Sequence, residues 1–175
     1  MKTLLQTSKA ITMDESINWK EIYDHLLPRV YHFFCYKTGD SLIAEELSAL
    51  CFEKAWTHRE NYRKNLNNFE AWVFGIAQKV AADHFRKRRR DVGLEAIPPE
   101  LARQHVEADV EQRLDFERLA SLMPCLSERE RLLIALKYGA ELNNRQIARQ
   151  TWLSESNVGT ILSRAVTKLR TEWEK

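Results

Sequence analysis

The sequence predicts an all-α protein, built of two small helical domains joined by a flexible linker. Apolar residues recur at helical spacing over most of the chain. Only five glycines and four prolines occur among 175 residues, too few for the many tight turns of an all-β fold. Helical spacing is lost between about residues 91 and 110, where Gly93, Pro98 and Pro99 occur. We therefore predict a leader over 1–16, domains over 17–90 and 111–175, and a linker over 91–110.

Composition narrows the class of protein. Hydrophobic residues make up 44% of the chain and aromatic residues 10%, enough for a packed core. The net charge of +2 argues against a globally basic nucleic-acid binder, so the local distribution of charge carries more information. No apolar run approaches the ~20 residues of a membrane span, and residues 1–13 lack the apolar centre of a secretory signal. We expect a cytoplasmic protein without membrane insertion.

The sequence predicts no catalytic residue, metal site or cofactor. Cys35, Cys51 and Cys125 lie far apart, form no CxxC pair and have no zinc-ligand spacing with histidines. No nucleophile, base and orienting group are arranged as an enzyme would need them. Buried thiols in a reducing compartment are the favoured interpretation, and a redox switch is the alternative.

Three helices are expected in the first domain. The first covers 17–38 and should kink or restart at Pro28. The second runs from Ser41 to about His58, with Asp40 or Ser41 as N-cap. The third runs from Asn68 to about Arg90 and ends in the basic run 86–90.

The second helix is apolar on more than one side. Ile43, Leu47 and Cys51 form one stripe, which Phe52 and Trp56 extend. A separate strip predicts a second contact surface, or else a helix buried between two neighbours of its own domain. It consists of Leu42, Glu46, Ala49, Leu50 and Glu53.

The third helix has small or short polar residues opposite its core stripe, at Ala71, Gly75, Gln78 and Ala82. Such residues permit close approach of another backbone, from protein or DNA. The loop before this helix, residues 61–68, combines amides, an aromatic ring and two cations. Such groups stack on unpaired bases and hold a nucleic-acid backbone. The alternative for the basic run at 86–90 is a solvated helix end.

The second domain has the pattern of a helix-turn-helix. A helix is expected near 110–123, and Ser127 with Glu130 forms a capping box for a helix to about Tyr138. Helices over 144–150 and 154–173 follow. The outer arc of the last helix suits a major groove, and a plain helical hairpin is the alternative. Its polar residues are Ser156, Asn157, Thr160, Ser163, Arg164 and Thr167, and Arg145, Arg149, Lys168 and Arg170 are placed to hold phosphates.

Taken together, these segments resemble the extracytoplasmic-function sigma factors, the smallest group of bacterial RNA polymerase sigma subunits. The resemblance rests on three runs in this order: 39–56 (with AEEL at 44–47 and FEKAW at 52–56), 69–90 (with FEAWVFGIA at 69–77), and 126–170 (from LSERER to KLR). It covers roughly residues 17–90 and 111–172. It implies a transcription initiation factor that is not itself an enzyme.

The resemblance also implies roles for individual residues. Core RNA polymerase would be bound through its clamp and flap, and an anti-sigma factor is a possible further partner. The clamp would contact Leu42, Glu46, Ala49, Leu50 and Glu53. Melted minus-ten DNA would contact Asn61, Tyr62, Arg63, Lys64, Asn65, Asn67, Asn68, Lys79, Arg86 and Arg90. Duplex minus-thirty-five DNA would contact Arg145, Arg149, Ser156, Asn157, Thr160, Ser163, Arg164 and Lys168.

The chain departs from the family pattern in three places. Ala49 and Leu50 stand where a polar pair is usual, and residues 159–161 lack two usual cations, which predicts weaker upstream DNA binding. Trp152 replaces the usual turn glycine, so we expect a different turn or a packed tryptophan. A LuxR-type regulator is the main alternative, although it would need a preceding receiver or ligand-binding domain. A helical RNA-binding or adaptor protein is the other.

Overall fold

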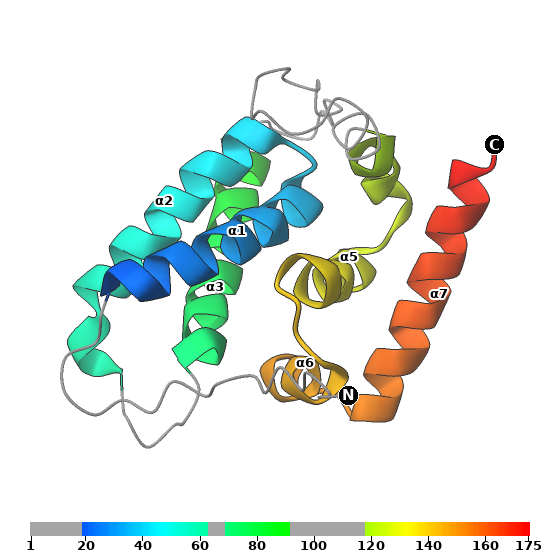
Figure 1. Ribbon diagram of the computed structural model, residues 1–175. Helices are drawn as coiled ribbons and strands as arrows, with labels where there is room; N and C mark the ends of the chain where they lie inside the picture. The colour runs from blue at the N-terminus through cyan, green and yellow to red at the C-terminus, as the bar shows by residue number, and fades with distance from the viewer. Residues whose placement is uncertain (1–18, 63–68, 92–117) are drawn as a thin grey trace, which may run out of the picture.

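The computed structural model describes residues 19–62, 69–91 and 118–175, and all regular structure in these ranges is helical (Figure 1). An all-α fold of two helical units is thereby confirmed. Residues 19–91 form the first unit and residues 118–175 the second. The predicted leader over 1–16 and the predicted linker, apart from Asp91, lie outside the described residues.

The first unit contains α1 (Trp19–Thr38), α2 (Ser41–Thr57), a 3-10 turn η1 (Arg59–Asn61) and α3 (Phe69–Asp91). Helix α1 continues through Pro28, which excludes the restart and leaves the kink as a prediction. Pro28 lies on the exposed side of α1. Proline has no N–H to donate to the carbonyl one turn earlier, and water can donate to that carbonyl instead. Asp40 is the N-cap of α2, and its carboxylate accepts hydrogen bonds from the backbone N–H groups of Leu42 and Ile43.

The second unit starts with a helical segment over 118–122 and a 3-10 turn η3 (Met123–Cys125), followed by α5 (Glu128–Ile134). The capping box of Ser127 and Glu130 is confirmed. Instead of continuing to Tyr138 as an α-helix, the chain widens into a π-helical turn, η4 (Ala135–Gly139). Helices α6 (Asn144–Thr151) and α7 (Glu155–Trp173) complete the unit, and Ser154 is the N-cap of α7 as predicted.

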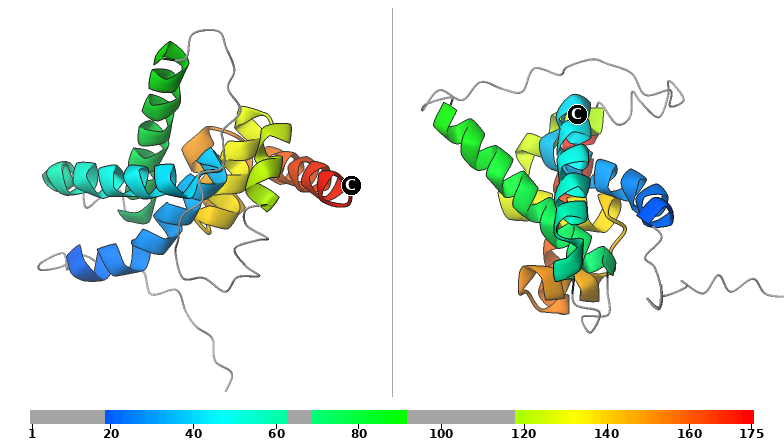
Figure 2. Two further views of the ribbon diagram at one scale, coloured as in Figure 1. Left: turned by 90° about the horizontal axis from the view of Figure 1, so that it is seen from above. Right: turned by 90° about the vertical axis from the view of Figure 1, so that its left-hand side faces the viewer.

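The buried side chains form one core that crosses both units. Phe33 and Phe74 of the first unit and Leu136 of the second belong to a single cluster and are fully buried. Figures 1 and 2 show α5 and η4 lying beside α1, so that the second unit packs directly on the first. The sequence predicted two domains on a flexible connection; it did not predict that they share a core.

The three cysteines have different environments. Cys35 and Cys51 are buried, and burial raises the pKa of each thiol to about 12. A thiol with such a pKa is almost wholly protonated near neutral pH and reacts slowly. The prediction of buried thiols is confirmed for these two. It is wrong for Cys125, which is exposed at the end of η3.

The turn of the helix-turn-helix contains Trp152 in the left-handed region, with φ 59° and ψ 28°. Its side chain is 94% exposed. Both expectations for this residue are therefore wrong: the turn keeps the left-handed conformation that suits glycine, and the ring does not pack. The backbone N–H groups of Trp152 and Leu153 both donate to the carbonyl of Ala148. These two hydrogen bonds at the end of α6 hold Trp152 in the left-handed conformation.

Replacing Trp152 by glycine is expected to stabilise the protein by up to about 1 kcal/mol, because glycine occupies this conformation without a Cβ penalty. The exposed ring gives up little packing when it is removed. Thermal unfolding followed by circular dichroism measures the change. Thr151→Gly is the matched control, since it introduces glycine at the last residue of α6, removes the hydrogen bond from the Thr151 hydroxyl to the Ile147 carbonyl, and should lower the melting temperature. A lower melting temperature for Trp152→Gly would contradict the argument.

Candidate functional site

The outer strip of α2, defined by Leu42, Glu46, Ala49, Leu50 and Glu53, lies wholly on the surface. Leu42 and Leu50 are each 38% exposed, and with the exposed Ala49 they give this face of the helix an apolar surface. Burial between two neighbours of its own domain, the alternative given by the sequence, is therefore wrong. The strip offers apolar contact area between carboxylates, a composition that suits a basic partner.

Trp56 extends this surface toward the end of α2. The sequence placed Trp56 in the core stripe, but its side chain is 50% exposed. The ring meets Trp19 edge-on, with centroids 5.1 Å apart, and the Arg59 guanidinium lies over it at 4.3 Å. Two neighbours thus fix the orientation of a half-exposed aromatic ring.

The predicted minus-ten loop is described only at its start, Asn61 and Tyr62. Arg63, Lys64, Asn65, Asn67 and Asn68 lie outside the described residues, and of Asn61 only the backbone, at the end of η1, is placed.

Tyr62 is 8% exposed, and its ring lies 5.2 Å from that of Phe69 and 5.4 Å from that of Trp72, centroid to centroid. In this arrangement Tyr62 anchors the loop to α3 and has no face open for stacking on a base.

Three cations on α3 complete the predicted minus-ten set. Lys79, Arg86 and Arg90 are all exposed, so they are available to phosphates. Arg86 is paired with Asp83 one turn earlier. A surface pair of this kind contributes little to stability and is readily exchanged for a phosphate.

The side of α3 that carries small residues meets the second unit at Ala71 and Gln78, whereas Ala82 on the same side is exposed. The Gln78 amide donates to the Gln150 side-chain oxygen at 2.5 Å. In return, the Gln150 amide donates to the backbone carbonyl of Ala71 at 3.3 Å. The group that approaches this side near Ala71 and Gln78 is therefore the Gln150 side chain of α6, whereas a Cβ at Gly75 would meet nothing within 4 Å. Sequence analysis found the small residues but missed Gln150 as their partner.

All eight residues predicted for the minus-thirty-five element are exposed. They lie on α6 and α7: Arg145, Arg149, Ser156, Asn157, Thr160, Ser163, Arg164 and Lys168. Val158, Leu162, Ala165 and Leu169 hold the opposite side of α7 in the core, which fixes the arc that faces outward.

Two of these cations already have carboxylate partners. The Arg145 Nε lies 3.7 Å from a Glu155 carboxylate oxygen, and the Lys168 Nζ lies 2.7 Å from one of Glu130. Lys168 and the capping hydrogen bonds of Ser127 hold the pKa of Glu130 below its usual range. DNA would have to compete with these carboxylates for the two cations.

Other kinds of site are not found in the described residues. No three histidine, cysteine or acidic side chains there gather closely enough to hold a metal ion. Within the same ranges, no helix is both long and apolar enough to cross a bilayer.

Two family models match the chain in the order that the resemblance predicts. Sigma-70 region 2 matches residues 22–91, which include α2 and α3. Sigma-70, region 4 matches residues 122–171, which include the helix-turn-helix.

Known proteins with similar sequences belong to one group. The chain is 28% identical to the ECF RNA polymerase sigma factor SigM of Bacillus subtilis over 151 residues, 86% of this chain and 91% of SigM. Over 151 residues it is 27% identical to the ECF RNA polymerase sigma factor RpoE of Cereibacter sphaeroides, covering 82% and 78% of the two chains. Identity to the ECF RNA polymerase sigma factor BldN of Streptomyces coelicolor is 24%, covering 85% of this chain and 57% of BldN.

Two solved structures have a similar fold. The sigma factor RpoE in complex with the anti-sigma factor NepR, from Bartonella quintana, matches with a TM-score of 0.67 at 21% identity, over 88% of this chain and 95% of that one. CnrH in complex with the cytosolic domain of CnrY matches with a TM-score of 0.61 at 19% identity, over 89% and 85%.

These matches decide between the alternatives left by the sequence. A LuxR-type regulator would need a receiver or ligand-binding domain where residues 22–91 match sigma-70 region 2, so that alternative has no support. The helical RNA-binding adaptor has none either, since both halves match regions of one family in family order. The chain belongs to the extracytoplasmic-function group of sigma factors, which are not enzymes but initiation factors that direct RNA polymerase to promoters.

Proposed function

We propose that the outer strip of α2 binds the coiled coil of the polymerase clamp. The observation that carries this is the pair of exposed leucines, Leu42 and Leu50, on the same strip as the carboxylates of Glu46 and Glu53. Desolvation of the leucines would supply affinity, and the carboxylates would steer a basic partner into register. Since Ala49 and Leu50 are apolar, the contact should depend less on salt than a polar contact would.

In the same scheme, α3 and the loop before it hold the melted minus-ten element. The buried ring of Tyr62, which packs on Phe69 of α3, would fix the start of this loop. A flipped base would be captured by the amides and cations of this loop, at the cost of its stacking energy. Lys79, Arg86 and Arg90 would neutralise the phosphates beside it.

The second unit would read the minus-thirty-five element by insertion of α7 into the major groove. Asn157 and Arg164 are the side chains on the outer arc best suited to base edges, because an amide or a guanidinium can form two hydrogen bonds to one base. Arg145, Arg149 and Lys168 would hold phosphates. The flap contact of the polymerase with this unit stays a prediction.

We also propose an anti-sigma factor as a partner. One of the solved structures described above holds a sigma factor in complex with an anti-sigma factor, and the other holds CnrH in complex with the cytosolic domain of CnrY. The exposed leucines of α2 would leave an apolar surface on the free protein, and such a surface is a common binding site for a regulatory partner.

Permanganate probing of promoter DNA tests the melting assignment. Unpaired thymines should appear only when the protein and core polymerase are both present. Arg86→Glu with Arg90→Glu should reduce the signal at least tenfold, since two phosphate contacts become repulsive. Asp83→Lys, which adds cationic charge on the same helix, is the control and should retain opening. Full opening by the double variant, or opening without polymerase, would contradict the assignment.

A further inference from the structure

The two units meet along a contact that glycine makes possible. Gly139, at the end of η4, lies directly on the backbone of α1. A Cβ atom at this position would lie 2.6 Å from the Phe33 nitrogen and 2.7 Å from its Cα, far inside van der Waals contact. Both of these Phe33 atoms belong to the backbone, so they cannot move away by a change of rotamer. A side chain of any size at residue 139 would push the second unit away from the first.

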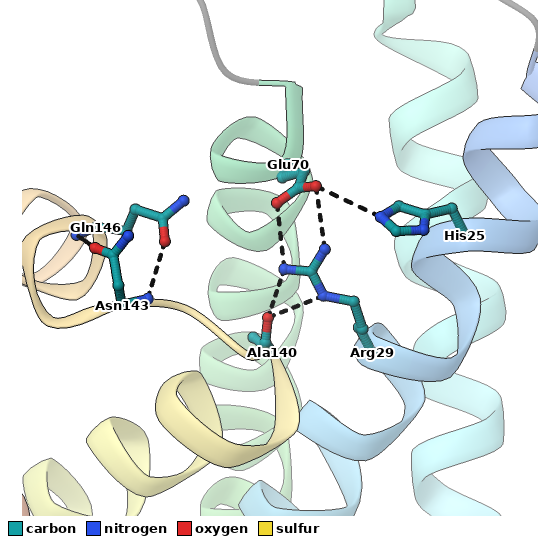
Figure 3. Close-up of polar contacts among 6 residues, drawn as sticks. All are labelled: His25, Arg29, Glu70, Ala140, Asn143 and Gln146. Carbon is teal, nitrogen blue, oxygen red and sulfur yellow. Dashed lines mark hydrogen bonds and ion pairs between the residues drawn. The ribbon is translucent and has the colours of Figure 1, made fainter. Parts of the chain in front are cut away.

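Arg29 reinforces this contact from α1 (Figure 3). Its Nε and Nη2 donate to the backbone carbonyl of Ala140 at 3.1 and 2.7 Å. The same guanidinium pairs with the Glu70 carboxylate of α3, with an Nη1–Oε1 distance of 3.1 Å. Only 12% of the Arg29 side chain is exposed, and Ala140 is fully buried. Charge-assisted hydrogen bonds shielded from water in this way are stronger than surface pairs.

The contact between the two units also involves α3, the helix that we assign to minus-ten DNA. Gln150 of α6 bonds to Gln78 and to the Ala71 carbonyl, and Glu128 of α5 pairs with Arg89 in the basic run. An amide, a carbonyl and a cation of α3 are therefore used by the second unit. They lie on the side of α3 that carries the small residues, so part of the surface that we assign to nucleic acid is already in use.

The packed arrangement is too short to reach both promoter elements. The minus-ten and minus-thirty-five elements are roughly 25 base pairs apart, which is about 85 Å along B-DNA. A compact chain of 175 residues has a diameter of only about 40 Å. The two units must separate before α3 and α7 can each lie on their own element.

We propose that the packed arrangement is a self-inhibited state, held closed by the Gly139 contact and the Arg29 bridge without any partner protein. This inference rests on the proposed function of α2, α3 and α7. Binding of polymerase would select the separated form, so the apparent affinity is lowered by the fraction of the protein that is open. If fewer than about one molecule in ten is open, any variant that opens the chain should bind at least about tenfold more tightly.

A matched pair of glycine variants tests the closed state. Gly139→Ala places a methyl group against Phe33, whereas Gly75→Ala makes the same change in α3, where a Cβ meets nothing within 4 Å. Arg29→Met keeps the length of the side chain but removes its polar contacts, and it is tested alone and with Gly139→Ala. Circular dichroism checks that each variant keeps its helices. Small-angle X-ray scattering of the full chain then measures the radius of gyration, and titration with core polymerase measures affinity.

We expect Gly139→Ala and Arg29→Met to raise the radius of gyration, the double variant to raise it most, and each to tighten polymerase binding. Gly75→Ala should match the wild type in both measurements. Equal scattering by the wild type and the double variant would overturn the closed state. Expansion with unchanged polymerase affinity would overturn its inhibitory role. Polymerase binding that survives Leu50→Arg would instead contradict the proposed function of α2, and it would leave the scattering result intact.

Discussion

Replacing Leu50 by arginine is expected to abolish binding to core RNA polymerase while leaving the protein folded. Leu50 is 38% exposed, so a longer polar side chain can reach water without disturbing the core beneath it. In a complex, the same guanidinium would be buried without a partner. Truncating or charging a central apolar contact of this kind costs 2 kcal/mol or more, which is about a thirtyfold loss of affinity.

Glu46→Arg tests the electrostatic half of the same surface. It replaces a carboxylate by a cation and should turn attraction into repulsion against a basic partner. Co-elution with core polymerase in size-exclusion chromatography measures both variants. Asp24→Arg is the control, because it makes an identical change of charge on α1, where Asp24 takes part in an exposed surface pair with Lys20. Retained binding by both Leu50→Arg and Glu46→Arg would remove the assignment of α2 to the clamp.

The second large effect is expected on α7. Arg164→Ala and Asn157→Ala should each weaken protection of the minus-thirty-five element about five- to a hundredfold, since a good bidentate base contact contributes about 1–3 kcal/mol. Neither side chain belongs to the core, so both variants should melt like the wild type. The two should differ in base preference, because each would read a different position.

Footprinting of the polymerase complex at several salt concentrations measures this effect. Arg129→Ala, which removes an exposed cation from α5, serves as the control for loss of charge alone. We expect a shallow salt dependence even for the wild type. Residues 159–161 carry no cation, and Arg145 and Lys168 already have carboxylate partners. A footprint unchanged by both substitutions would show that α7 does not lie in the groove.

The expected results depend on charged groups that cluster on single helices. The net charge of the whole chain was therefore a poor guide to its binding surfaces. A value of +2 for the whole chain conceals the acidic strip of α2 and the basic end of α3. Sequence spacing separated the two surfaces because each lies on a single helix, where residues three or four apart share a face. The exposed strip of α2 and the outer arc of α7 were therefore predictable residue by residue.

The sequence by itself determined the helices, most of their ends and the faces that they bury. Ser127 and Ser154 were recognisable as caps, and Asp40 as one of two candidates, because a capping side chain acts within three residues of its own position. The family also followed from local runs in a fixed order.

Only the tertiary structure decided how the two units meet, that Tyr62 points inward, and that Trp152 takes a left-handed conformation. Arg29 and Ala140 are 111 residues apart in sequence, and no local pattern links an arginine to one particular carbonyl. In the sequence, Gly139 looks like an ordinary glycine at the end of a helix. Only the fold shows that it lies against the Phe33 backbone. Contacts of this kind depend on shape complementarity between distant surfaces, which short-range periodicity and capping do not encode.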